Sequence, residues 1–188
     1  MRDDVIAKAR EKSDINEHLV FLYDLAVKKR PKKIIECGIR HGISAFSLRR
    51  AARTVGAHYY GIDIDKRCQI ALDKDQIPGL REFFSAEHDC VWAICHLEKL
   101  WKQFVMIDTS HEENHTFAEL RIFGKADTIC LHDSNNERFP GVRLAIERFL
   151  GKEGVIWTED FVILCGEWMV THFAKNNGMT ILERMIEV

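Results

Sequence analysis

The stretch Lys33-Ile34-Ile35-Glu36-Cys37-Gly38-Ile39-Arg40-His41-Gly42 decides the fold. Its first half, Lys33–Cys37, is a short apolar run of the kind that forms a strand covered on both faces. Gly38 and Gly42 follow this run, and a helical apolar pattern begins at Ser44. A turn at this place points backbone amides and the positive end of a helix at a ligand, and glycines leave room for the ligand to approach. The stretch therefore predicts a βα unit with a ligand cradle between its strand and its helix.

The same alternation of short apolar runs and longer helical patterns extends along the chain. The predicted parallel strands are Lys33–Cys37, His58–Ile62, Leu80–Ser85, Phe104–Ile107 and Thr128–His132, and the helices after the first strand are Ser44–Thr54, Lys66–Asp75, Val91–Leu100, Glu113–Phe123 and Val142–Leu150. This order is typical of a doubly wound α/β domain around a mostly parallel sheet. We expect one Rossmann-like domain over residues 1–188.

The two ends of the chain depart from this rhythm. Ser13 and Asp14 can cap an N-terminal helix over residues 15–29. Near the C-terminus, the strand-like runs Glu167–Ala174 and Met179–Val188 flank the turn-forming sequence Asn176-Asn177-Gly178, which predicts an antiparallel hairpin that closes the sheet. The segment 155–165 has no clear pattern.

Composition and charge exclude several classes of protein. With 46% hydrophobic residues, 30% charged residues and 3 prolines, the chain reads as an ordinary globular domain. It has no apolar run of roughly 18 residues and no apolar signal segment, so we expect a cytoplasmic protein without a membrane partner. A net charge of −2 argues against nonspecific nucleic-acid binding. The scattered cysteines favour reduced, buried thiols, and the spacing of His88, Cys90, Cys95 and His96 fits no common zinc module.

The loop after the first strand favours a cationic cofactor. Asp63 ends the second predicted strand, where a carboxylate can bind ribose hydroxyls. The loop carries Arg40 and Ile43 where a dinucleotide fingerprint would have glycines, which disfavours a nicotinamide cofactor. Glu36 would repel a pyrophosphate but attract the amino and sulfonium groups of S-adenosylmethionine. The alternative is that Gly38 and Gly42 only make a tight turn.

The run from Ile34 to Ser44 resembles the first motif, E-x-G-x-x-x-G, of class I S-adenosylmethionine-dependent methyltransferases. The further segments that resemble this superfamily are Ser13–Leu19, Tyr60–Asp65, Ile107–His111, Leu131–Asp133 and Asn176–Arg184. They are similar to a small bacterial and phage branch related to catechol-type and sugar-type O-methyltransferases and to the cephalosporin-hydroxylase group. With the strands numbered along the chain, the resemblance implies a seven-stranded sheet in the order 3-2-1-4-5-7-6, with the last strand antiparallel.

The resemblance also implies roles for single residues. Those implied for the cofactor are Glu36, Gly38, Gly42 and Ser44 around the methionine end, Asp63 on the ribose, Glu87 at the adenine, and Asp108 beside the sulfonium. Many members of the superfamily carry glycine where this chain has Arg40. The adenine position is the least defined, because residues 85–88 replace the usual Gly-Asp step.

Two carboxylates and two histidines define the expected reaction end of the site. Asp108 and Asp133 end neighbouring predicted strands, so both should open onto the crevice beside the cofactor. Such a pair can bind Mg²⁺ or Mn²⁺, which would activate a substrate hydroxyl, although Ser134 stands where metal-dependent relatives have asparagine. Alternatively, His111 or His132 acts as general base near neutral pH without a cation. A third interpretation is that Asp108 only caps the helix near Glu113 and His132 only ends a strand.

These residues predict an O-methyltransferase that acts on a small hydroxylated metabolite. The N-terminal helix and the segment Ser134–Pro140 should shape the acceptor pocket, with help from a second subunit if the protein is a homodimer. The alternatives are methylation of a nucleic acid or a protein, and a cofactor-binding or scaffold protein without transferase activity.

Overall fold

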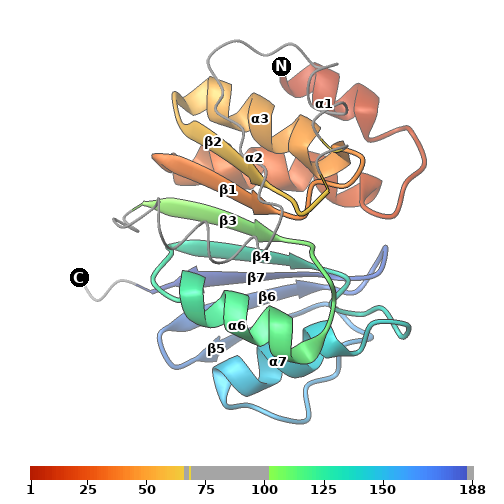
Figure 1. The fold of residues 1–188 in the computed structure, drawn as a ribbon, viewed down its shortest axis with the longest axis vertical. Helices are drawn as coiled ribbons and strands as arrows, with labels where there is room; N and C mark the ends of the chain where they lie inside the picture. Colours follow the sequence, from red (N-terminus) through yellow and green to blue (C-terminus); the bar gives the residue numbers. More distant parts are fainter. Residues whose placement is uncertain (66–67, 69–101, 186–188) are drawn as a thin grey trace.

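The computed structural model describes residues 1–65, 68 and 102–185. Several predicted features lie outside the described residues. They are the strand Leu80–Ser85, the helix Lys66–Asp75 except for Cys68, the helix Val91–Leu100 and the adenine candidate Glu87. The remaining elements form a mixed sheet with helices on both faces (Figure 1).

Seven strands form this sheet within the described residues, in the order β2-β1-β3-β4-β7-β6-β5. Their bounds are β1 Lys33–Cys37, β2 His58–Ile62, β3 Gln103–Ile107, β4 Thr128–His132, β5 Phe161–Cys165, β6 Trp168–Phe173 and β7 Met179–Arg184. The strands β2, β1, β3 and β4 pair in parallel, whereas β7 is antiparallel to β4 and β6. The fold class and the antiparallel last strand are therefore confirmed. The edge strand β5 comes from the segment that the sequence left unassigned.

The helices cover the sheet in two groups. Their bounds are α1 Arg2–Lys8, the short 3₁₀ helix η1 Asn16–His18, α2 Leu19–Lys29, α3 Ile43–Val55, α6 Glu113–Phe123 and α7 Gly141–Leu150. Figure 1 shows α1, α2 and α3 beside β1 and β2, and α6 and α7 beside the C-terminal strands. No described helix has the length and apolar character needed to cross a membrane.

Burial on both faces explains why the central strands read as continuous apolar runs. Ile34 belongs to one hydrophobic core, with residues of α2 and α3, and its neighbour Ile35 belongs to the other, with residues of α6 and α7. Successive side chains of a strand point to opposite faces, so a strand covered on both faces is apolar at most of its positions. This arrangement places the carboxyl ends of β1, β2, β3 and β4 at one edge of the sheet.

The N-terminal helix differs from its prediction. Residues 16–18 form a 3₁₀ turn, the α-helix begins at Leu19, and Ile15 takes the N-cap position without a side-chain cap. The Ser13 hydroxyl accepts a hydrogen bond from the Ile15 amide, and the Asp14 carboxylate pairs with Arg40 at 3.1 Å. The two residues expected to cap the helix are thus used in the turn before it and in a contact with the loop after β1.

The turn between β6 and β7 contains the predicted Asn-Asn-Gly sequence. Asn176, Asn177 and Gly178 all have positive φ, at 51°, 67° and 86°, a conformation that asparagine and glycine tolerate best. A Cβ on Gly178 would lie 2.5 Å from the Asn135 amide, and that amide donates to the Asn177 carbonyl at 2.7 Å. The turn is therefore packed against the loop that follows β4.

Candidate functional site

A pocket of about 880 Å³ lies at the carboxyl ends of the parallel strands. It is lined by Gly38 after β1, Asp63 after β2, Asp108 after β3 and Asp133 after β4. Further lining residues come from the predicted acceptor segment, namely Asn136, Arg138 and Phe139, and from the N-terminal segment, namely Asp14. The pocket lies where ligands bind in open α/β sheets.

Asp63 holds the loop between β1 and α3. Its Oδ2 accepts hydrogen bonds from the amides of Ile39 at 2.8 Å and Arg40 at 3.0 Å, and its Oδ1 accepts one from the Asp65 amide at 2.8 Å. The Cys68 thiol is a further hydrogen-bonding neighbour of this carboxylate, so its roughly four lone-pair sites are largely used within the protein. Asp63 therefore lines the pocket and also holds the loop after β1 in place.

The loop bends through a series of left-handed residues. Gly38, Arg40 and Gly42 have φ values of +86°, +48° and +72°. The left-handed region favours glycine, so Arg40 occupies a conformation that is uncommon for a residue with a side chain. Here the conformation of Arg40 is held by the hydrogen bond from its amide to Asp63 and by its side-chain pairing with Asp14.

Glycine is also needed at position 38 for a reason that the sequence did not show. A Cβ there would lie 2.0 Å from the Asp108 carbonyl oxygen and 2.6 Å from the Asp108 carbonyl carbon. The sequence suggested that Gly38 leaves room for a cofactor, but the close neighbour is the protein's own backbone. Gly38 lets β1 and β3 approach each other at the edge of the pocket.

Glu36 and Ser44 lie behind the loop, away from the pocket lining. The Glu36 side chain is fully buried and accepts hydrogen bonds at 2.5 Å from the Ser44 and Tyr59 hydroxyls. Burial raises the pKa of Glu36 to about 7, against an ordinary value of 4.5, although the two hydroxyls oppose this change. In this position, Glu36 joins β1, β2 and α3.

Glu36→Gln should remove one component of the pH dependence of stability. Because the folded-state pKa is raised, the unfolded chain ionises near pH 4.5 while the folded chain keeps its proton up to about pH 7. The wild type should therefore lose on the order of 3 kcal/mol of stability relative to the variant as pH rises across this window. Urea unfolding of both proteins between pH 4.5 and pH 7.5 measures the difference. Parallel curves would mean that Glu36 ionises normally in the folded protein.

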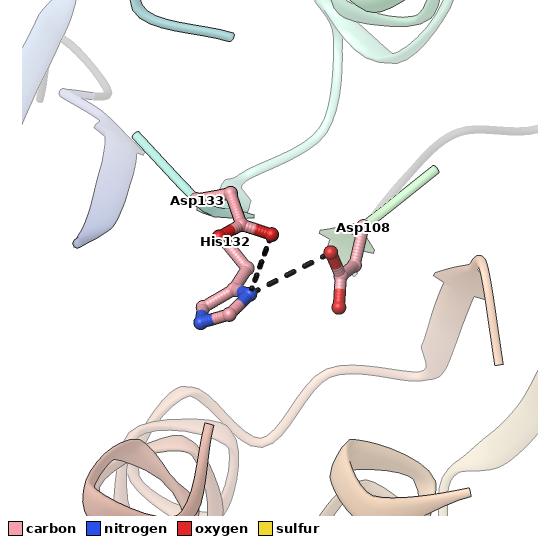
Figure 2. Close-up of side chains that lie close together, drawn as sticks. All are labelled: Asp108, His132 and Asp133. Atoms are coloured by element: carbon pink, nitrogen blue, oxygen red, sulfur yellow. Dashed lines mark ion pairs between the residues drawn. The ribbon is translucent and has the colours of Figure 1, made fainter. Parts of the chain in front are cut away.

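The two carboxylates and two histidines expected at the reaction end form one cluster. His111 Nε2 lies 3.0 Å from Asp108 Oδ1 and 2.9 Å from Asp133 Oδ2. His132 Nδ1 lies 3.6 Å and 3.3 Å from the same two oxygens (Figure 2). Asp108 accepts its hydrogen bond from His111, and α6 has no side-chain cap, so Asp108 is not the cap of that helix.

The protonation of this cluster follows from its geometry. Burial alone would lower the pKa of both imidazoles, but the two carboxylates raise it to about 9 for His111 and about 10 for His132. Burial likewise opposes ionisation of Asp108 and Asp133, but the histidines hold the pKa of both carboxyls below the usual range. As the alternative to a cation, the sequence suggested a histidine that titrates near neutral pH. In this arrangement each imidazole is protonated on both nitrogens at pH 7. It must lose one of these protons before it can act as a base.

Neighbouring residues, most of which the sequence did not single out, fix the cluster in place. The Asn136 amide donates to Asp133 Oδ1 at 2.7 Å, and the Phe139 ring stacks on His111 with centroids 4.5 Å apart. His111 and Asp133 both have positive φ, at 60° and 58°, which is uncommon outside glycine and often marks functional sites. The only signal in the sequence for Asn136 and Phe139 is that both lie in the predicted acceptor segment.

Ser134, which the sequence placed next to the expected metal ligand Asp133, does not join the cluster. Its hydroxyl is buried, accepts a hydrogen bond from Thr180 at 2.9 Å and lies 3.4 Å from His172 Nδ1. The three residues whose ligand atoms lie within 4.8 Å of one another are instead Asp108, His132 and Asp133. Among the described residues, His132 therefore supplies the third donor that Ser134 does not.

Comparison with known proteins places this fold. No protein-family model matches the sequence, and no curated protein matches it. Among solved structures, a putative O-methyltransferase from Klebsiella pneumoniae is 18% identical, over 98% of this chain and 90% of that one, with a TM-score of 0.62. The O-methyltransferase TomG from Streptomyces achromogenes, in complex with S-adenosylmethionine, is 15% identical over 98% and 89%, with a TM-score of 0.61. An O-methyltransferase from Bacillus cereus, bound to S-adenosylhomocysteine, is 14% identical over 97% and 90%, with a TM-score of 0.60. The chain has the fold of class I S-adenosylmethionine-dependent methyltransferases.

Proposed function

We propose that this protein is an S-adenosylmethionine-dependent methyltransferase that methylates a hydroxyl group of a small metabolite. The observation that carries the proposal is that one pocket of about 880 Å³ joins the loop after β1 and Asp63 to the cluster of Asp108 and Asp133. The volume is in the range of small-molecule sites. Similar solved structures hold S-adenosylmethionine or S-adenosylhomocysteine, which supports the same cofactor here.

The cradle would hold the cofactor through Asp63 and the backbone of the loop at 38–42. The Asp63 carboxylate lines the pocket, where a ribose hydroxyl could reach it, while it fixes the Ile39 and Arg40 amides. When bound, S-adenosylmethionine supplies an electrophilic methyl group on its sulfonium. Asp108 lines the pocket next to Gly38, so its side chain connects the cradle with the reaction end.

The cluster would position the acceptor hydroxyl. The donor set fits a divalent cation such as Mg²⁺ or Mn²⁺, because two carboxylates converge and His132 Nδ1, which lacks a well-formed hydrogen bond, faces both of them. A bound cation would lower the pKa of a coordinated hydroxyl. Without a cation, His111 is the histidine of the cluster that lines the pocket, so it is placed to orient the hydroxyl or, once it has lost its own extra proton, to accept the proton of the hydroxyl.

The acceptor end of the pocket suits a small ring-bearing molecule. Phe139 is 40% exposed, lines the pocket and stacks on His111, so its free face can carry a ring next to the cluster. An aromatic face packs equally well on a phenolic ring or on the apolar face of a sugar. The proposal is therefore a phenolic or sugar-like hydroxyl as methyl acceptor.

A cofactor titration tests the proposal. S-Adenosylmethionine should bind, and Asp63→Ala should weaken its binding about tenfold or more. The ribose would lose a charge-assisted hydrogen bond of about 1.5–3 kcal/mol, and the loop after β1 would lose the carboxylate that holds its amides. The matched control is Asp65→Ala, which removes a carboxylate two residues away that does not line the pocket. Calorimetry gives both affinities, and circular dichroism verifies that both variants are folded.

Two outcomes would count against the proposal. If the wild-type protein does not bind S-adenosylmethionine, the fold serves another purpose. If it binds but Asp63→Ala and Asp65→Ala bind equally well, the ribose contact lies elsewhere in the pocket.

A further inference from the structure

The backbone fixes the orientation of the His132 ring. Its Nε2 lies 3.1 Å from the Asp14 carbonyl oxygen and 3.3 Å from the Asn176 carbonyl oxygen. Carbonyl oxygens only accept hydrogen bonds, so Nε2 must carry a hydrogen. The side chain is 1% exposed, and it is fixed between the N-terminal segment and the β6–β7 turn.

This anchoring leaves Nδ1 as the functional end of the ring. Nδ1 points at Asp108 and Asp133 (Figure 2), is buried, and forms no hydrogen bond of good geometry. A metal-binding histidine characteristically donates its other ring N–H to a backbone carbonyl or a carboxylate, which fixes its tautomer and orientation. His132 has this arrangement before any metal is considered.

We propose that His132 Nδ1, Asp108 and Asp133 form a mixed nitrogen and oxygen site that selects a first-row transition cation over Mg²⁺. The proposal rests on the cation site described under the proposed function, for which the sequence suggested only the carboxylates as ligands. The new element is what the nitrogen ligand implies for the choice of cation. This ligand changes which cation the site should take, whatever reaction the pocket supports.

The separations of the donor atoms fit a common cation. Metal–ligand bonds of about 2.0–2.2 Å place neighbouring ligand atoms roughly 3.0–3.5 Å apart. His132 Nδ1 lies 3.3 Å from Asp133 Oδ2 and 3.6 Å from Asp108 Oδ1, and all three donor atoms lie within 4.8 Å of one another. Small side-chain rotations would therefore bring the three atoms onto one ion.

The ligand types determine the selectivity. Mg²⁺ prefers oxygen ligands, whereas imidazole suits Zn²⁺, Co²⁺, Fe²⁺ and Ni²⁺. His111 is the less suitable nitrogen donor, because it lies on a loop, is 17% exposed and stacks on Phe139. We therefore assign the ligand role to His132, and we leave His111 free to face the acceptor.

Binding of the metal alone tests this assignment without cofactor or acceptor. Calorimetry at fixed pH should show that the wild-type protein binds Co²⁺ at least about 100-fold more tightly than Mg²⁺. His132→Ala should lower Co²⁺ affinity about tenfold or more and leave Mg²⁺ affinity within about threefold. The matched control is His111→Ala, which should not lower Co²⁺ affinity, because it removes a cationic neighbour of the two carboxylates and no ligand. Equal losses in both variants, or no preference for Co²⁺ over Mg²⁺, would overturn the proposal.

A second measurement on the wild type removes dependence on a buried substitution that can impair folding. Long-range proton–nitrogen spectra of protein labelled with ¹⁵N-histidine should show a large shift of one Nδ1 resonance when Zn²⁺ is added, with hydrogen retained on Nε2 of the same ring. A shift of an Nε2 resonance instead would assign the ligand to His111 and refute the role of His132. Neither of these two experiments uses S-adenosylmethionine. A negative result in them would therefore not affect the proposal of cofactor binding, and a negative cofactor titration would not affect the proposed metal site.

Discussion

Gly38→Ala should destabilise this protein far more than Gly56→Ala. Both glycines have positive φ, +86° and +72°, so an alanine at either position carries a similar backbone strain of about 1–2 kcal/mol. Around Gly56 there is nothing within 4 Å of the added Cβ, whereas at Gly38 the Cβ would lie 2.0 Å from the Asp108 carbonyl oxygen. Relief of that overlap requires β1 and β3 to separate, at a further cost of about 1–3 kcal/mol.

Urea unfolding of the two variants and the wild type measures this difference. The slope of the transition should stay constant while the midpoint falls more for Gly38→Ala. The displaced loop should also impair cofactor binding, because Gly38 and Asp108 both line the pocket. Equal midpoints for the two variants would show that the loop can move without affecting the sheet, and the glycine would then be needed only for its backbone conformation.

The central strands were predictable because they are covered on both faces. Lys33–Cys37, His58–Ile62 and Thr128–His132 match β1, β2 and β4 in both bounds. In contrast, β5 escaped prediction because it lies at the edge of the sheet, where Val162 and Leu164 are 64% and 69% exposed and the flanking turns leave no periodic signal. An edge strand buries only part of its surface, so its sequence is less constrained.

The candidate site was predictable in its positions but not in its contacts. Strand ends identify Asp63, Asp108 and Asp133, since parallel strands bring their carboxyl ends to one edge. No local pattern shows that Gly38 faces the Asp108 carbonyl, or that His132 is anchored by carbonyls of residues 14 and 176. These contacts join segments far apart in the sequence, so they depend on the folded structure.

Asp133→Asn should have the largest effect on catalysis. Asp133 Oδ2 contacts both His111 and His132, and Oδ1 accepts the hydrogen bond from Asn136. An amide at this position keeps the shape but removes the charge that both routes of hydroxyl activation require. On an accepted substrate, the rate of S-adenosylhomocysteine formation should fall about 100-fold or more. Cofactor affinity should stay nearly unchanged, because the cradle lies on other strands.

Asp108→Asn should behave similarly, and Glu113→Gln serves as a control that removes an exposed carboxylate outside the pocket.

A chelator separates the two routes. If a cation is used, EDTA should stop the wild-type reaction, and an added divalent cation should restore it in the wild type but not in the Asp133 variant. If His111 acts without a cation, EDTA should have no effect and His111→Gln should abolish turnover. Full activity of both aspartate variants would remove the cluster from the mechanism.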